Sequence, residues 1–127
     1  MSNLISLSSV MFIPGQGQGY REALVSFFGM ARAAGFDGVD LNLADFAREG
    51  FALSQDNWEN WIDHLGEAAA QAGLALPQAH GLVYRSIDST NPFLPDRPWF
   101  EEKIRRSILA AKRLQVPWLV LHPTDFV

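Results

Sequence analysis

The chain has 127 residues, of which 48% are apolar, with a net charge of −4 and no cysteine. This length fits one domain over 1–127, and the missing cysteines exclude disulfides and suit a reducing cytoplasm. No apolar run approaches the roughly 20 residues that span a bilayer, and the net charge of −4 disfavours binding to the phosphate backbone of nucleic acid. We therefore expect a soluble cytoplasmic protein without a membrane or nucleic-acid partner.

The first half of the chain predicts two strands, over 5–12 and 36–43, each followed by a helix. The apolar stripe of the first helix consists of Leu24, Phe27, Phe28, Ala31 and Ala34. That of the second consists of Trp58, Trp61, Ile62, Leu65, Ala69 and Ala72. Ser54 is the expected N-cap of the second helix, and Gly35 and Gly73 end the two helices.

The second half predicts strands over 74–80 and 117–122, with a third helix between them. Pro98 suits the first turn of this helix, whose stripe consists of Phe100, Ile104, Ile108, Ala111 and Leu114. The order β-α-β-α-β-α-β predicts an α/β fold with a parallel sheet. Since a complete (β/α)8 barrel takes about 250 residues, we expect the first half of such a barrel, with four strands and three helices, in a truncated chain.

Ligand sites of parallel α/β sheets lie beyond the carboxyl ends of the strands. Alternation places Asp40 on one face of the second strand and puts Gln78 and His80 on one face of the third, while His122 ends the fourth. Neighbouring strands lie roughly 5 Å apart, so Asp40, His80 and His122 are expected to converge. Two imidazoles and a carboxylate can hold a divalent metal or move protons.

Each of these residues also has a structural interpretation. A histidine that ends a buried strand is often only a hydrogen-bonded structural group, and Asp40 can cap a loop. Arg85 can reach an anionic substrate group or be solvated. The glycine-rich segment 14–19 lacks the spacing of a nucleotide-binding loop and is interpreted as a loop at the barrel mouth.

Three segments in order, 34–41 (AGFDGVDL), 76–81 (LPQAHG) and 119–123 (LVLHP), resemble the xylose isomerase-like TIM-barrel superfamily. Its members include sugar and sugar-phosphate isomerases and epimerases, inositol-pathway enzymes and metal-dependent apurinic endonucleases. The resemblance implies a divalent metal, Mn, Zn or Mg, and proton transfer next to the carbonyl of a sugar or polyol. It also implies that His80 and His122 line the pocket or bind the metal, with Gln78 and Arg85 as candidate substrate contacts.

The family's metal-binding and acid/base carboxylates come mostly from later strands, and Asp40 falls where the family often has glutamate. We therefore expect the N-terminal portion of a metal-dependent sugar or sugar-phosphate isomerase or epimerase, inactive by itself. Three alternatives are an apurinic endonuclease-like zinc phosphodiesterase, a flavodoxin-like non-catalytic module, and a half barrel that self-associates through exposed sheet edges.

Overall fold

A computed structural model of the chain describes residues 4–9, 20–47, 51–82 and 97–121. Its elements in chain order are β1 (Ser6–Ser8), α1 (Tyr20–Ala33), β2 (Gly38–Asn42), α2 (Leu43–Phe46), the 3₁₀ helix η2 (Ala52–Ser54), α3 (Trp58–Gln71), β3 (Ala75–His80), α4 (Arg97–Arg113) and β4 (Trp118–Val120). The predicted α/β class is confirmed. The short helices α2 and η2 were not predicted, and Leu43 begins α2 instead of ending a strand.

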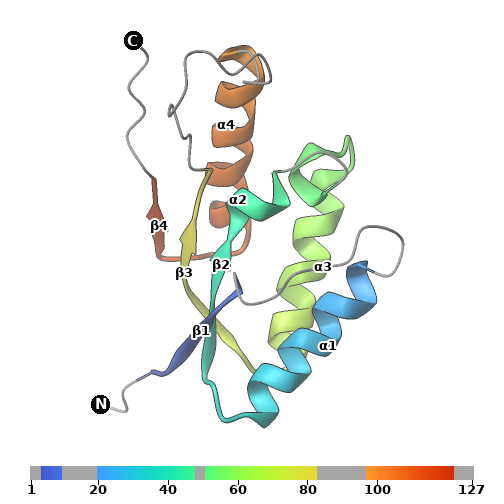
Figure 1. Cartoon of the computed structure of the whole chain (residues 1–127), viewed down its shortest axis with the longest axis vertical. Helices are drawn as coiled ribbons and strands as arrows, with labels where there is room; N and C mark the ends of the chain where they lie inside the picture. The colour runs from blue at the N-terminus through green and yellow to red at the C-terminus, as the bar shows by residue number, and fades with distance from the viewer. Residues whose placement is uncertain (1–3, 10–19, 48–50, 83–96, 122–127) are drawn as a thin grey trace, which may run out of the picture.

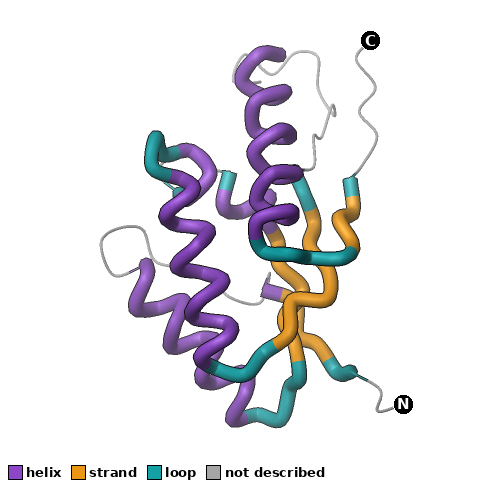
Figure 2. The backbone as a smooth tube through the Cα atoms, turned by 180° about the vertical axis from the view of Figure 1, so that it is seen from behind, coloured by secondary structure: helices purple, strands orange, loops and turns teal. Residues whose placement is uncertain are grey.

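The four strands form one sheet in the order β1-β2-β3-β4, and all three pairings are parallel. Figures 1 and 2 show the long helices α1, α3 and α4 together on one side of this sheet. Consecutive strands are therefore neighbours, and each long helix is a crossover between two of them. This is the arrangement predicted for the first units of a β/α barrel.

The core lies between the helices and one face of the sheet. Val39, Leu41 and Ala79 of the strands are 0% exposed, as are Phe28 of α1 and Ile62 of α3. Burying a large apolar side chain contributes roughly 1.5–3 kcal/mol, so this layer is the main source of stability. The predicted stripes of α1 and α3 are confirmed in the main, although Ala34 is exposed and follows the end of α1.

The three junctions from a long helix to the next strand share one backbone turn. Gly35, Gly73 and Gln115 occupy the same place in it, with positive φ values of 91°, 69° and 55°. In each turn, the residue that follows donates its N–H to a carbonyl five positions earlier: Phe36 to Ala31, Leu74 to Ala69, and Val116 to Ala111. This bond is typical of the Schellman motif, and its recurrence shows a structural repeat of helix, turn and strand.

The predicted N-cap of the second helix is wrong. Ser54 is not an N-cap, because its Oγ donates to the carbonyl of Phe51 at 2.7 Å, and α3 begins only after Asn57.

The predicted buried stripe of the third helix is wrong in part. In α4, Ile108 is 45% exposed, whereas Lys103 and Ser107 are buried beside Ala111. The physical reason is that polar side chains of α4 bond to the segment after β2 and so fix the rotation of the helix. The Phe100 side chain lies outside the described part.

No helix in the described ranges combines the length and apolar content required to cross a membrane.

Candidate functional site

The candidate site lies on the face of the sheet opposite the three long helices. Strand register aligns Ser8 with Asp40, Asp40 with Gln78, and Gln78 with Trp118. These residues alternate with the buried ones, and Asp40 and Gln78 are only partly exposed while Trp118 is 72% exposed. In the next row toward the carboxyl ends, His80 is aligned with Asn42 and with Val120. Polar side chains therefore cover much of this face.

A bulge in β3 sets the phase of its polar side chains. Two steps along β2, from Gly38 to Asp40, match three steps along β3, from Ala75 to Gln78. Pro77 lies within this stretch and has no N–H to donate to the ladder, which is where a strand tolerates proline. A Cβ at Gly38 would lie 2.9 Å from the Ala75 carbonyl oxygen, so only glycine fits opposite the bulge. Beyond it, Gln78 and His80 face the same way as Asp40.

Asp40 bonds to two side chains of β3. Its Oδ1 lies 3.1 Å from Nδ1 of His80, and its Oδ2 accepts a hydrogen bond of 3.2 Å from Nε2 of Gln78. The Asp40 side chain is 17% exposed and that of His80 is 35% exposed. With both oxygens engaged and water partly excluded, the carboxylate has a fixed orientation.

This pairing determines what His80 can do chemically. A carboxylate beside Nδ1 favours the tautomer that carries its proton on Nδ1, so that the opposite nitrogen, Nε2, has the lone pair. Nε2 is then the atom for accepting a substrate proton or for binding a metal, and the carboxylate stabilises the imidazolium that proton transfer produces. Gln78 holds Asp40 in place and so acts on His80 indirectly.

The carboxyl end of β2 is fixed by two further bonds. The backbone N–H of Asn42 donates to Oγ of Ser9 at 2.7 Å, and Nδ2 of Asn42 donates to Oδ2 of Asp45 at 2.8 Å. Ser9 is only 4% exposed, which makes its hydroxyl an internal link between the ends of two strands. Sequence reasoning missed Ser9 and Asp45. A sequence signal does exist for Asp45. It is a carboxylate three residues after the amide of Asn42, which is a spacing at which the two side chains can form a local hydrogen bond.

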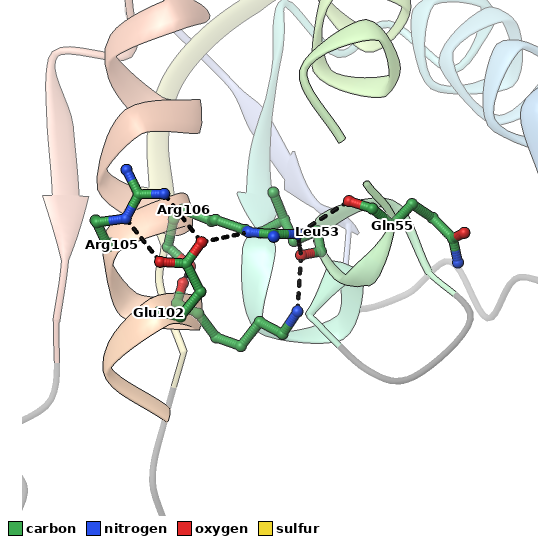
Figure 3. A network of polar contacts seen from close by, with 7 residues as sticks. Leu53, Gln55, Glu102, Arg105 and Arg106 are labelled. Carbon is green, nitrogen blue, oxygen red and sulfur yellow. Dashed lines mark hydrogen bonds and ion pairs between the residues drawn. The ribbon is translucent and has the colours of Figure 1, made fainter. Parts of the chain in front are cut away.

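A cluster on α4 holds the connection between β2 and α3, and we call Glu102, Lys103 and Arg106 the α4 clamp. Nζ of Lys103 donates to the carbonyl of Leu53 at 3.1 Å. Nη1 of Arg106 donates to the carbonyls of Leu53 and Gln55, both at 2.9 Å. Figure 3 shows these bonds reaching η2 and the residue just after it. The clamp therefore anchors the segment between α2 and α3, which follows β2 in the chain.

The charges of the clamp change two pKa values. Hydrogen bonds from Arg105 and Arg106 to Glu102 lower the pKa of this carboxyl from 4.5 to about 2, and Figure 3 shows both guanidinium groups beside it. Burial lowers the pKa of Lys103, and the positive charge of Arg106 adds to this effect. Glu102 is therefore charged at neutral pH, and its contacts with Arg105 and Arg106 are ion pairs with charge-assisted hydrogen bonds.

Of the residues predicted for the site, Asp40, Gln78 and His80 are brought together. His122 and Arg85 lie outside the described residues, as does the glycine-rich segment 14–19. Within the described ranges, no group of three or more His, Asp or Glu side chains is placed to hold a metal. His80, oriented by Asp40, does have the arrangement of a metal-binding histidine with a carboxylate behind it.

The fold and this geometry define a class, a parallel β/α protein in which an aspartate within one strand contacts a histidine at the carboxyl end of the next. Comparisons with family models, with curated proteins and with solved structures found no match to the chain.

Proposed function

We propose that this chain supplies the first four strands and three crossover helices of a metal-dependent sugar or sugar-phosphate isomerase or epimerase barrel. The observation that carries the proposal is the contact of Asp40, in the middle of β2, with His80 at the carboxyl end of the neighbouring parallel strand β3. Such a pair is suited to moving a proton next to a carbonyl, which is the central step of both reactions. The ligand would be a sugar or polyol, and the protein cytoplasmic.

The order of the strands supports a barrel over a flavodoxin-like module. In doubly wound sheets the strand order reverses at a switch point, and helices cover both faces. Here consecutive strands are neighbours throughout, and the long helices all lie on one side. A barrel keeps one face of its sheet for the interior, which agrees with the polar row of Asp40 and Gln78 on the opposite side.

Each proposed residue has a distinct role. His80 accepts or donates the proton, or binds a divalent metal (Mn, Zn or Mg) through Nε2, and Asp40 orients it. His122 is proposed as a second metal-binding or pocket histidine, with Arg85 and Gln78 contacting the substrate. Since the carboxylate ligands of the xylose isomerase-like superfamily come from later strands, we expect this chain by itself to be inactive as an isomerase.

Metal binding by the chain is tested by titration with Mn²⁺, which broadens NMR signals of nearby nuclei. The chain has three histidines, and His64 is an internal control because it lies on α3, in a shallow groove with α1. We expect the ring signals of His80 to broaden before those of His64, and His80→Asn to remove the effect at neighbouring amides. Equal broadening of both histidines would contradict the metal-binding part of the proposal.

The endonuclease alternative uses the same two histidines, and the net charge of −4 disfavours it. Addition of a keto-sugar such as fructose should shift the His80 ring signals, whereas abasic DNA with Zn²⁺ should stay intact. Cleavage of abasic DNA without any response to the keto-sugar would favour the zinc phosphodiesterase instead.

We propose as well that copies of the chain associate through the edges of their sheets. Apolar residues are exposed at or beside the outer strands: Ile5, just before β1, is 58% exposed, and Trp118 of β4 is 72% exposed. Unpaired strand edges with apolar side chains favour pairing with another strand.

A further inference from the structure

Two carboxamide side chains of the central strands lie beside Asp40 and His80 on the same face of the sheet. Register aligns Asp40 of β2 with Gln78 of β3, and two residues further along it aligns Asn42 with His80. All four residues are partly exposed, whereas the residue between them on each strand is 0% exposed. The four therefore form one patch, two residues by two, which we call the polar patch.

A carboxylate fixes the orientation of each carboxamide. Nδ2 of Asn42 donates to Oδ2 of Asp45 at 2.8 Å, and Nε2 of Gln78 donates to Oδ2 of Asp40 at 3.2 Å. Because a carboxylate only accepts hydrogen bonds, the nitrogen of each amide must face it, and the carbonyl oxygen is turned to the other side. Oδ1 of Asn42 and Oε1 of Gln78 are therefore the atoms that the two amides offer to a ligand.

Both of these carbonyl oxygens are accessible. Within the described ranges, no backbone or side-chain group donates a hydrogen bond to either of them. The same part of the chain contains no polar side-chain atom that is both buried and without a partner. Since the two oxygens have no partner in the protein, they must reach the surface, where a ligand can replace the solvent.

The polar patch is suited to hydrogen-bond donors. The two carbonyl oxygens accept hydrogen bonds, and the Asp40 carboxylate adds a negative charge beside them. A hydroxyl group donates to such acceptors, whereas the oxygens of a phosphate group are acceptors themselves and are repelled. Asn42 and Gln78 are diagonal neighbours on parallel strands, with Cα atoms roughly 8 Å apart, so a ligand with hydroxyl groups on several carbons can reach both.

We propose that Oδ1 of Asn42 and Oε1 of Gln78 accept hydrogen bonds from two hydroxyl groups of a neutral sugar or polyol, and that the polar patch does not take a phosphate group. The inference rests on the function proposed above and narrows it, because it names the atoms that hold the substrate beside His80. Asn42 is thereby assigned as a substrate contact.

The side-chain NH₂ signals of Asn42 and Gln78 in ¹H–¹⁵N NMR spectra test this contact, because a hydrogen bond at the carbonyl oxygen polarises the whole amide. We expect fructose to shift both pairs of signals. Inorganic phosphate should leave them in place, and so should a fully O-methylated fructose, which has no hydroxyl donor. Shifts caused by phosphate or by the methylated sugar would overturn the proposal, as would signals that stay in place throughout the fructose titration.

Variants test the two oxygens one at a time, with the signals of the remaining amide as the measure of affinity. Asn42→Leu and Gln78→Met keep the size of the side chain and remove the carbonyl oxygen, so each should weaken fructose binding roughly 3- to 10-fold. Asn60→Leu and Gln71→Met are the matched controls, because both residues are exposed on α3, on the other side of the sheet (Figure 2). The controls should bind fructose like the wild type. Unchanged affinity in folded Asn42→Leu and Gln78→Met, checked by circular dichroism, would contradict the proposal.

These experiments separate the hydroxyl contacts from the proposed metal and proton chemistry. Titration with Mn²⁺ reports on His80, whereas the amide signals report on Asn42 and Gln78. If fructose shifts both amides but His80 binds no Mn²⁺, the polar patch holds a polyol and the metal-dependent isomerase proposal fails. If His80 binds Mn²⁺ but fructose leaves both amides in place, only the assignment of Asn42 and Gln78 fails.

Discussion

Asp40 of β2 connects the polar side chains of the candidate site, because it contacts two residues of β3. It accepts a hydrogen bond from Gln78 and contacts Nδ1 of His80, and its side chain is only 17% exposed. Because the hydrogen bond from Gln78 already fixes the Asp40 carboxylate, little conformational entropy is lost when the carboxylate orients the His80 ring. In the proposed role of His80, its tautomer is expected to depend on Asp40, and the position of Asp40 on Gln78.

Glu102 of the α4 clamp gives a pH dependence with a definite sign. The arginine hydrogen bonds lower the pKa of Glu102 from 4.5 to about 2, so its contribution to stability is complete above pH 4.5 and is lost as pH falls toward 2. Its side chain is 36% exposed, and solvent screening reduces the effect. Urea unfolding across this pH range should show a smaller loss of stability for Glu102→Gln than for the wild type.

Asp63 also contributes to the loss of stability in acid, in the wild type and in Glu102→Gln alike. Its hydrogen bonds from Arg113 lower its pKa, so it contributes to the acid loss in the same direction in both proteins. The effect of Glu102 is the difference between the two pH profiles. Parallel profiles over the whole range would show that the clamp does not stabilise the fold through this carboxylate.

Single residues differ in how far the sequence alone predicts them. Alternation correctly placed Gln78 and His80 on one face of their strand, because the period of a strand fixes which side chains share a face. It did not predict the hydrogen bond of Gln78 with Asp40, since that contact depends on the bulge before Gln78. Ser9 was missed because its role requires two strand ends to be adjacent in space.

At the scale of elements, the repeated turn after each long helix leads to a prediction about Gln115. Glycine adopts the positive φ of this turn without steric cost, whereas a residue with a Cβ is strained there. Gln115 has a φ of 55° where the other two turns have Gly35 and Gly73. Gln115→Gly should therefore raise the free energy of unfolding by about 0.5–1 kcal/mol, measured by urea denaturation.

Gly73→Ala is the matched control for the same turn and should lower stability by about 1 kcal/mol or more, because its φ is 69°. A destabilised Gln115→Gly would show that the Gln115 side chain contributes more than the relief of backbone strain.

The helices show why sequence patterns succeed in one element and fail in another. The stripes of α1 and α3 are apolar throughout, so their buried faces followed from spacing, as with Phe28 and Ile62. In α4, the buried positions include the polar residues Lys103 and Ser107. Because the prediction assumed that buried positions are apolar, it wrongly placed Ile108 on the buried face. The rotation of α4 depends on acceptors in another segment, the carbonyls of Leu53 and Gln55, which no local pattern contains.

At the scale of the whole molecule, the sheet has one face covered by helices and one that carries the polar row of the site. The alternation of strands and helices predicted the parallel sheet and its class, because crossovers between parallel strands need intervening helices. Ile5, just before β1, and Trp118 of β4 are exposed beside the two outer strands, where we propose that copies of the chain associate. Association and proton transfer are separate proposals, because they involve different residues.

The most direct test of the central claim, that Asp40 orients His80 for proton transfer, is the tautomer of the His80 ring. Long-range ¹H–¹⁵N NMR correlations distinguish the two neutral forms, at a pH where the ring is uncharged. The contact with Asp40 predicts a proton on Nδ1 in the wild type and a shift toward the Nε2-protonated form in Asp40→Asn. A wild-type ring protonated mainly on Nε2 would contradict the account.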